Sequence, residues 1–232
     1  METPAILTAA IICITSLAYL VFYTLYWPGV FEFYVGTFLL IGFFAAWVVV
    51  MTKFGKVTKS TSLRTTDFAM IAVFGGINTV VLWVMMFLPG ALAYIPWTVA
   101  FTSYLPAGII LAALLKIVPK PGAAFTFLII TMIMGQIIHL DMLWAPWYIL
   151  KAVGIEAYYL TCKRGTKSSL VLMGVAYGIF SSATGAIFYI GVWLYWQPLL
   201  VTLPVAILCG ITAAIGASIG YGIGSRAGKI AL

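Results

Sequence analysis

The amino-acid sequence predicts an all-α integral membrane protein with about eight transmembrane helices and both termini in the cytoplasm. Three observations support this fold class: the composition, the number of long apolar stretches and the distribution of basic residues. The 232 residues are 64% hydrophobic and only 7% charged, whereas a soluble domain carries roughly 25% charged residues. Twelve basic and five acidic side chains are too few to cover a surface that faces water. A soluble enzyme and a nucleic-acid-binding domain are therefore excluded.

Long apolar stretches are the second observation. A transmembrane helix needs about 20 consecutive, mostly apolar residues. Eight stretches meet this requirement, at residues 5–26, 33–51, 67–88, 97–118, 123–140, 144–162, 169–193 and 199–224. No strand pattern and no soluble domain lies between them.

The basic residues supply the third observation, because they occupy alternate connections between the apolar stretches. Those connections and the C-terminal tail contain Lys53, Lys56, Lys59, Arg64, Lys116, Lys120, Lys163, Arg164, Lys167, Arg226 and Lys229. The intervening connections contain Glu32 and Asp141 but neither Lys nor Arg. Since Lys and Arg concentrate in cytoplasmic loops, the basic connections are predicted to be cytoplasmic.

The longest hydrophilic segment organises the chain into three parts. Residues 1–52 are predicted to form an N-terminal transmembrane helix pair, residues 53–66 a basic cytoplasmic loop, and residues 67–232 a six-helix core. Thr65 or Thr66 is expected to cap the first core helix, and Asp67 is favourable in its first turn.

Two ionisable residues lie inside the sixth apolar stretch. An ionisable side chain near the centre of a bilayer costs at least about 2.5–3.5 kcal/mol on insertion scales, so Lys151 and Glu156 are candidate functional residues. They lie about 140° apart around a helix and are not an ideal mutual pair. For Lys151, an outward-reaching side chain is the structural alternative. For Glu156, it is a hydrogen bond within the bundle.

Further polar and aromatic residues extend this group. The predicted substrate-binding residues are Asn78, Gln136, His139, Trp144, Trp147, Tyr148, Lys151 and Glu156. Hydrogen-bonding groups beside aromatic rings suit a small, flat, polar ligand. For Asn78, a hydrogen bond between helices is the favoured structural alternative. His139 is the only histidine, which argues against a catalytic metal centre, and we expect no metal, cofactor or catalytic residue.

Small residues recur at helical spacing in two stretches. Ala72 and Gly76 lie four positions apart in the third stretch, and Gly216, Gly220 and Gly224 repeat every four residues in the eighth. Such faces allow helix backbones to approach closely. They are predicted either to pack within this chain or to dock on a separate membrane subunit.

Several features of residues 64–224 occur together. A basic loop precedes a six-helix core, and Ala72 and Gly76 lie on the first core helix. Residues 119–124 read Pro-Lys-Pro-Gly-Ala-Ala, and Gly154 and Glu156 form a Gly-x-Glu pair. In these features the chain resembles the substrate-binding S components of energy-coupling-factor (ECF) vitamin transporters, and is most similar to the hydroxymethylpyrimidine/thiamine-type group. It departs from that group in its additional N-terminal helix pair and in residues 125–128, which lack an acidic residue.

The resemblance implies a transport protein rather than an enzyme. It implies capture of a vitamin or vitamin precursor from outside the plasma membrane of a prokaryote, followed by delivery through a transmembrane coupling subunit and two ATPase subunits. Glu156 would then accept a hydrogen bond from an aminopyrimidine, while Trp144, Trp147 or Tyr148 would stack on the ring. Lys151 would favour an anionic or neutral ligand.

Three other functions compete with vitamin capture. A structural or assembly subunit of a larger membrane complex would use the small-residue faces for contact and the intramembrane charges to lock helices together. An ion-coupled permease would use Glu156 and Lys151 as a proton relay, although no internal repeat supports it. A membrane enzyme is disfavoured, because the sequence contains no hydrolase motif and one histidine.

Overall fold

In the described residues, the fold consists of eight α-helices and one short π-helix. The structure, a computed structural model, describes residues 3–26, 29–54, 62–87, 97–139, 143–193 and 198–230. The elements are α1 (Thr3–Tyr26), α2 (Val30–Phe54), α3 (Thr65–Phe87), the π-helix η2 (Ala100–Tyr104), α4 (Leu105–Ile117), α5 (Ala123–His139), α6 (Ala145–Thr161), α7 (Lys167–Trp193) and α8 (Leu199–Ile230). Their number and order confirm the predicted all-α class.

Membrane-spanning length is reached in six segments of the described chain. These are Thr3–Tyr26, Val30–Lys53, Thr65–Met85, Ala100–Ile117, Lys167–Gly191 and Leu199–Gly228. Helices α5 and α6 are shorter, at 17 residues each. Together these helices form a multi-pass membrane fold.

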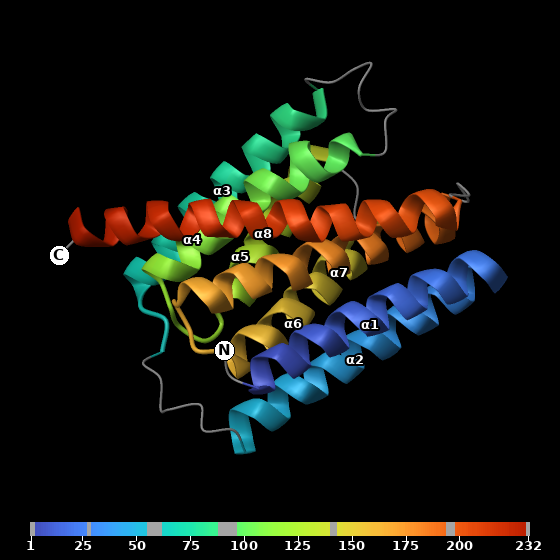
Figure 1. Ribbon diagram of the computed structural model, residues 1–232, viewed down its shortest axis with the longest axis horizontal. Helices are drawn as coiled ribbons and strands as arrows, with labels where there is room; N and C mark the ends of the chain where they lie inside the picture. The colour runs from blue at the N-terminus through green and yellow to red at the C-terminus, as the bar shows by residue number, and fades with distance from the viewer. Residues whose placement is uncertain are drawn as a thin grey trace.

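The short helix α6 lies in the interior of the bundle. It contacts α1, α2, α5 and α7, which surround it in Figure 1. Every residue from Leu150 to Thr161 except Val153 is buried. Because protein rather than lipid surrounds this helix, Lys151 and Glu156 are sheltered from the hydrocarbon.

The N-terminal helix pair packs directly on the remaining helices. Helix α1 lies along α7, and α2 lies along α6. Ala9 and Ile12 of α1 and Phe44 of α2 belong to the same buried cluster as residues of α4 to α8. The rings of Phe44 and Phe180 meet edge to face at 5.4 Å. The pair therefore shares its hydrophobic core with the other six helices.

Glycines allow α8 to pack closely against α4. A Cβ atom at Gly216 or Gly220 would collide with the carbonyl oxygen of Leu105 or Ile109, and one at Gly224 would lie 2.7 Å from the carbonyl oxygen of Ala113. This face of α8 is thus covered within the chain. The prediction that Gly216, Gly220 and Gly224 dock on another subunit is wrong for this face, because α4 already occupies it.

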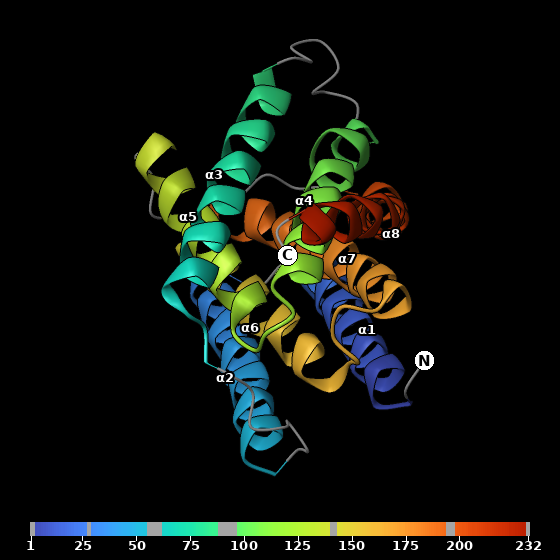
Figure 2. The ribbon, with the colours of Figure 1, turned by 90° about the vertical axis from the view of Figure 1, so that its left-hand side faces the viewer.

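Polar contacts join the helix ends that carry the basic residues, which we call the basic end. In Figure 2 the basic end faces the viewer, and the C-terminus of α8 lies at this end. Lys116 Nζ donates to the carbonyl oxygen of Gly165 at 3.1 Å, and Lys120 Nζ pairs with Asp67 Oδ2 at 2.5 Å. The same carboxylate oxygen accepts from the Arg64 N–H at 2.6 Å. Asp67, rather than a threonine, therefore caps the start of α3.

Candidate functional site

Lys151 occupies a cage of two aromatic rings on its own helix. Trp147 and Tyr148 precede it by four and three residues, so the three side chains share one face of α6. Lys151 Nζ lies 3.4 Å from the centroid of the Trp147 ring and 4.0 Å from that of Tyr148. The lysine is only 3% exposed. The ring faces attract its ammonium group. Lys151 forms no ion pair with another described residue.

Hydrogen bonds to α7 hold the Trp147 ring in place. Its indole Nε1 donates to Thr184 Oγ1 at 3.0 Å and to the carbonyl oxygen of Ser181 at 3.2 Å. Gly185 leaves space for the ring, since a Cβ there would lie 3.3 Å from it. The cage around Lys151 is therefore rigid on the Trp147 side.

Trp144 packs one turn away from this cage. Its ring stacks on Phe188 at 4.7 Å between centroids and meets Tyr189 edge to face at 4.9 Å. It also contacts Trp147 edge to face at 5.4 Å. Trp144 thus extends the aromatic surface toward the end of α6 that lies opposite the basic end.

Two buried amide side chains have an unpaired oxygen. Asn78 on α3 is 1% exposed and Gln136 on α5 is 7% exposed. Neither Asn78 Oδ1 nor Gln136 Oε1 has a hydrogen-bond partner among the described residues. A buried polar atom without a partner costs about 1–3 kcal/mol, and most buried polar atoms in proteins avoid that cost. These two acceptors are therefore available to a ligand that carries N–H or O–H groups.

Neighbouring contacts place these amides near the depth of the cage. A Cβ at Gly135 of α5 would lie 3.8 Å from the Tyr148 hydroxyl, and one at Gly76 of α3 would lie 3.4 Å from Met134. Helices α3 and α5 run in the same direction and α6 runs in the opposite one. The amides and the cage consequently lie within about one or two helical turns, each ~5 Å, along the bundle. We call the residues at this depth the Lys151 site: Trp147, Tyr148 and Lys151 on α6, Gln136 on the adjoining α5, and Asn78 on α3, which packs on α5.

Glu156 has a different environment at the basic end of α6. It is 4% exposed, and its Oε1 and Oε2 accept hydrogen bonds from the N–H groups of Gly122 at 2.7 Å and Phe125 at 3.0 Å. These N–H groups belong to the start of α5, where a negative charge is favourable. The glycine in the preceding turn is required, because Gly122 has a φ of 83°. Glu156 therefore anchors α5 to α6 and does not join the Lys151 site, so the contacts favour its structural interpretation.

The remaining predicted residues divide between the described and undescribed parts. His139 is the last residue of α5, and its side chain lies outside the described part of the structure, as does Asp141. Ala72 is exposed on α3, whereas Gly76 faces the Met134 side chain of α5. The predicted docking pair is thus split between a free position and an internal contact.

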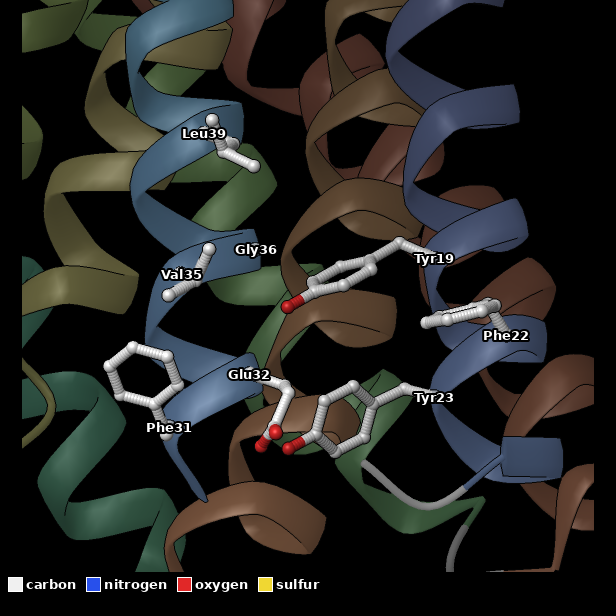
Figure 3. A pocket seen from close by; sticks show the side chains of 8 residues that line it. All are labelled: Tyr19, Phe22, Tyr23, Phe31, Glu32, Val35, Gly36 and Leu39. Carbon is white, nitrogen blue, oxygen red and sulfur yellow. The ribbon is translucent and has the colours of Figure 1, made fainter. Parts of the chain in front are cut away.

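A cleft between α1 and α2 was not predicted from the sequence. Figure 3 shows its lining, which consists of Tyr19, Phe22, Tyr23, Phe31, Glu32, Val35, Gly36 and Leu39 around a volume of about 250 Å³. Tyr19 donates to the carbonyl oxygen of Phe33 at 3.2 Å and Tyr23 to that of Gly29 at 3.1 Å. The sequence contains a pattern that could have predicted this cleft. Tyr19 and Tyr23 lie four positions apart, as do Glu32 and Gly36 in the following stretch.

Comparison with known proteins gives no match: no protein family, no curated protein and no solved structure is significantly similar to this chain.

Proposed function

We propose that the chain is the substrate-capture membrane subunit of an ECF-type importer, and that it binds a vitamin or vitamin precursor related to thiamine or hydroxymethylpyrimidine. The observation that carries this proposal is the Lys151 site. It combines a buried lysine, two aromatic rings and two amide oxygens that have no partner in the part of the chain that the structure describes. Groups that are buried and unpaired favour a function in binding, because a ligand supplies the partners that the fold leaves out.

The site defines the chemistry of the proposed ligand. The amide oxygens of Asn78 and Gln136 accept from N–H groups on the ligand, and Lys151 donates to an acceptor such as a carbonyl or an anionic group. The aromatic faces suit a planar ring. A cationic thiazolium placed against Lys151 is disfavoured by repulsion, so the proposed ligand is neutral or anionic.

Delivery of the ligand requires partner chains in this proposal. A transmembrane coupling subunit and two ATPase subunits, in the plasma membrane of a prokaryote, would drive the reorientation of the capture subunit. Helix α3 offers the exposed Ala72 for such a contact. The glycines of α8 do not, because α4 covers them.

Mass spectrometry of small molecules that co-purify with the detergent-solubilised chain tests this proposal. We compare the wild type with Lys151→Met, which removes the ammonium group, and with Lys53→Met as the matched control at an exposed position. A pyrimidine-containing vitamin or precursor is expected in the wild type and in the control but not in Lys151→Met. An equal amount of that compound in all three samples would exclude the Lys151 site as its binding site.

An assembly subunit of a larger membrane complex is the second candidate function. Glu156 favours it, because its hydrogen bonds lock α5 to α6 within the chain instead of remaining available to a ligand. In the same experiment, this function predicts no small molecule in any sample and instead the co-purification of other membrane subunits in stoichiometric amounts.

A further inference from the structure

We propose that the cleft between α1 and α2 binds a phospholipid with an ammonium headgroup, and that Glu32 pairs with the ammonium. This site is separate from the Lys151 site and is independent of the transport proposal. The carboxylates of the described chain differ in whether the fold provides them with a partner.

Among the described residues, Glu32 is the carboxylate that has neither an ion pair nor a hydrogen bond to a backbone N–H. Of the three carboxylates in the described ranges, Asp67 pairs with Lys120 and Glu156 accepts two backbone N–H groups. Glu32 is exposed in the first turn of α2 and forms no ion pair within the described chain. A cation from outside the protein complements this charge.

Aromatic rings surround the carboxylate in the cleft. In Figure 3 the hydroxyl of Tyr23 lies next to the Glu32 carboxylate, and the Tyr19 ring lies one turn further along α1. The hydrogen bonds of Tyr19 to the carbonyl of Phe33 in α2 and of Tyr23 to the carbonyl of Gly29, just before α2, fix their rings. Phe31 is exposed at the same end of the cleft. A carboxylate beside aromatic rings is a favourable site for an ammonium group.

The rest of the cleft is apolar and leads into the bilayer. Val35 and Leu39 follow Glu32 along α2 and are exposed, so Leu39 lies about 10 Å deeper in the membrane than Glu32. Gly36 allows the Tyr19 hydroxyl to approach α2 closely and form this part of the cleft wall, because a Cβ there would lie 2.5 Å from that hydroxyl. A charged group at the membrane surface above an apolar channel matches a lipid, whose headgroup and acyl chain have the same order.

The packing of the helix pair explains why the cleft exists. Helix α1 packs mainly on α7 and α2 mainly on α6, so the two helices of the pair are held apart by different neighbours. The volume of about 250 Å³ is smaller than a typical drug-sized pocket of roughly 300–1,000 Å³. It therefore accommodates a headgroup and the beginning of one chain rather than a whole lipid.

Native mass spectrometry of the full chain, delipidated in detergent, tests the proposal. Dioleoyl phosphatidylethanolamine and dioleoyl phosphatidylglycerol carry the same acyl chains, but the first has an ammonium group and no net charge, whereas the second lacks the ammonium group and is anionic. We expect the wild type to bind the ethanolamine lipid about tenfold more tightly, a factor that corresponds to about 1.4 kcal/mol. Glu32→Gln should lose this preference, and equal preference in wild type and Glu32→Gln would overturn the proposal.

Two glycines on α2 provide a matched pair that locates the site. Gly36→Leu fills the cleft, whereas Gly42→Leu projects into open space, since a Cβ at Gly42 has no atom within 4 Å. Tight binding should be lost in Gly36→Leu and kept in Gly42→Leu, and the opposite result would place the lipid elsewhere. Soluble glycerophosphoethanolamine should not displace the lipid at equal concentration. Displacement would show that the cleft binds a free amine rather than a membrane lipid.

Discussion

Two buried charged residues in the interior of α6 differ in how the fold satisfies them. On the side of the basic end, both oxygens of Glu156 accept backbone N–H groups from the start of α5. Five residues earlier, Lys151 contacts two ring faces and lies near the depth of two amide oxygens that have no partner among the described residues. Depth in a membrane helix therefore does not by itself identify a binding residue. Whether the hydrogen-bonding capacity is already used by the protein separates the two cases.

The largest expected effect on stability is at Glu156. Glu156→Ala removes both acceptors and leaves two buried N–H groups at the start of α5 without their partner, which costs about 3 kcal/mol. For a chain of this length, that loss corresponds to a melting temperature lower by about 6–12 °C. Thermal unfolding in detergent measures it. Lys53→Ala is the control, since Lys53 is exposed and lies outside both proposed sites, and an equal decrease in both variants would contradict the anchoring function of Glu156.

A smaller effect is expected at Asp67, which also lies at the basic end. Asp67→Asn weakens the pair with Lys120 and the cap on Arg64. Because both side chains of the pair are partly accessible to solvent, the loss is about 1 kcal/mol and falls as the salt concentration rises. A double-mutant cycle with Lys120→Gln, followed by thermal unfolding at two salt concentrations, measures the coupling. A coupling energy that does not change with the salt concentration would show that the pair is shielded from solvent, as Glu156 is.

The smallest effect on stability is expected at Lys151, because its interpretation as a binding residue requires that the fold does not depend on it. Lys151→Met loses the attraction to the rings, about 2 kcal/mol for a desolvated pair, but also removes the cost of burying a charge. The melting temperature should therefore change by no more than a few degrees, which corresponds to about 1 kcal/mol. A decrease as large as that of Glu156→Ala would make Lys151 a structural residue.

Hydropathy and charge predicted the helices well because they depend on local composition. The eight stretches and the order of the basic connections follow from the length of a bilayer-spanning helix and from the side on which Lys and Arg remain. The cage of Trp147 and Lys151 is also local, since i,i+4 spacing brings the two side chains together on one helix.

The contacts that the sequence did not predict connect distant segments. Glu156 meets backbone N–H groups more than thirty positions away, and backbone groups carry no residue-specific signal. A glycine stripe has the same pattern whether α4 or another protein covers it, so only the packing of α8 decided between them. The cleft depends on α1 and α2 having different neighbours, which is a property of the whole bundle.

The burial of α6 has a consequence for how the protein is made. On insertion scales, Lys151 and Glu156 together oppose the entry of this helix into a bilayer by about 5–7 kcal/mol, so α6 is a poor substrate for membrane insertion on its own. Helix α5 precedes it directly and already provides the donors for Glu156. During synthesis, the two helices should therefore leave the translocation machinery as one hairpin, and α6 should insert only after its partners are present.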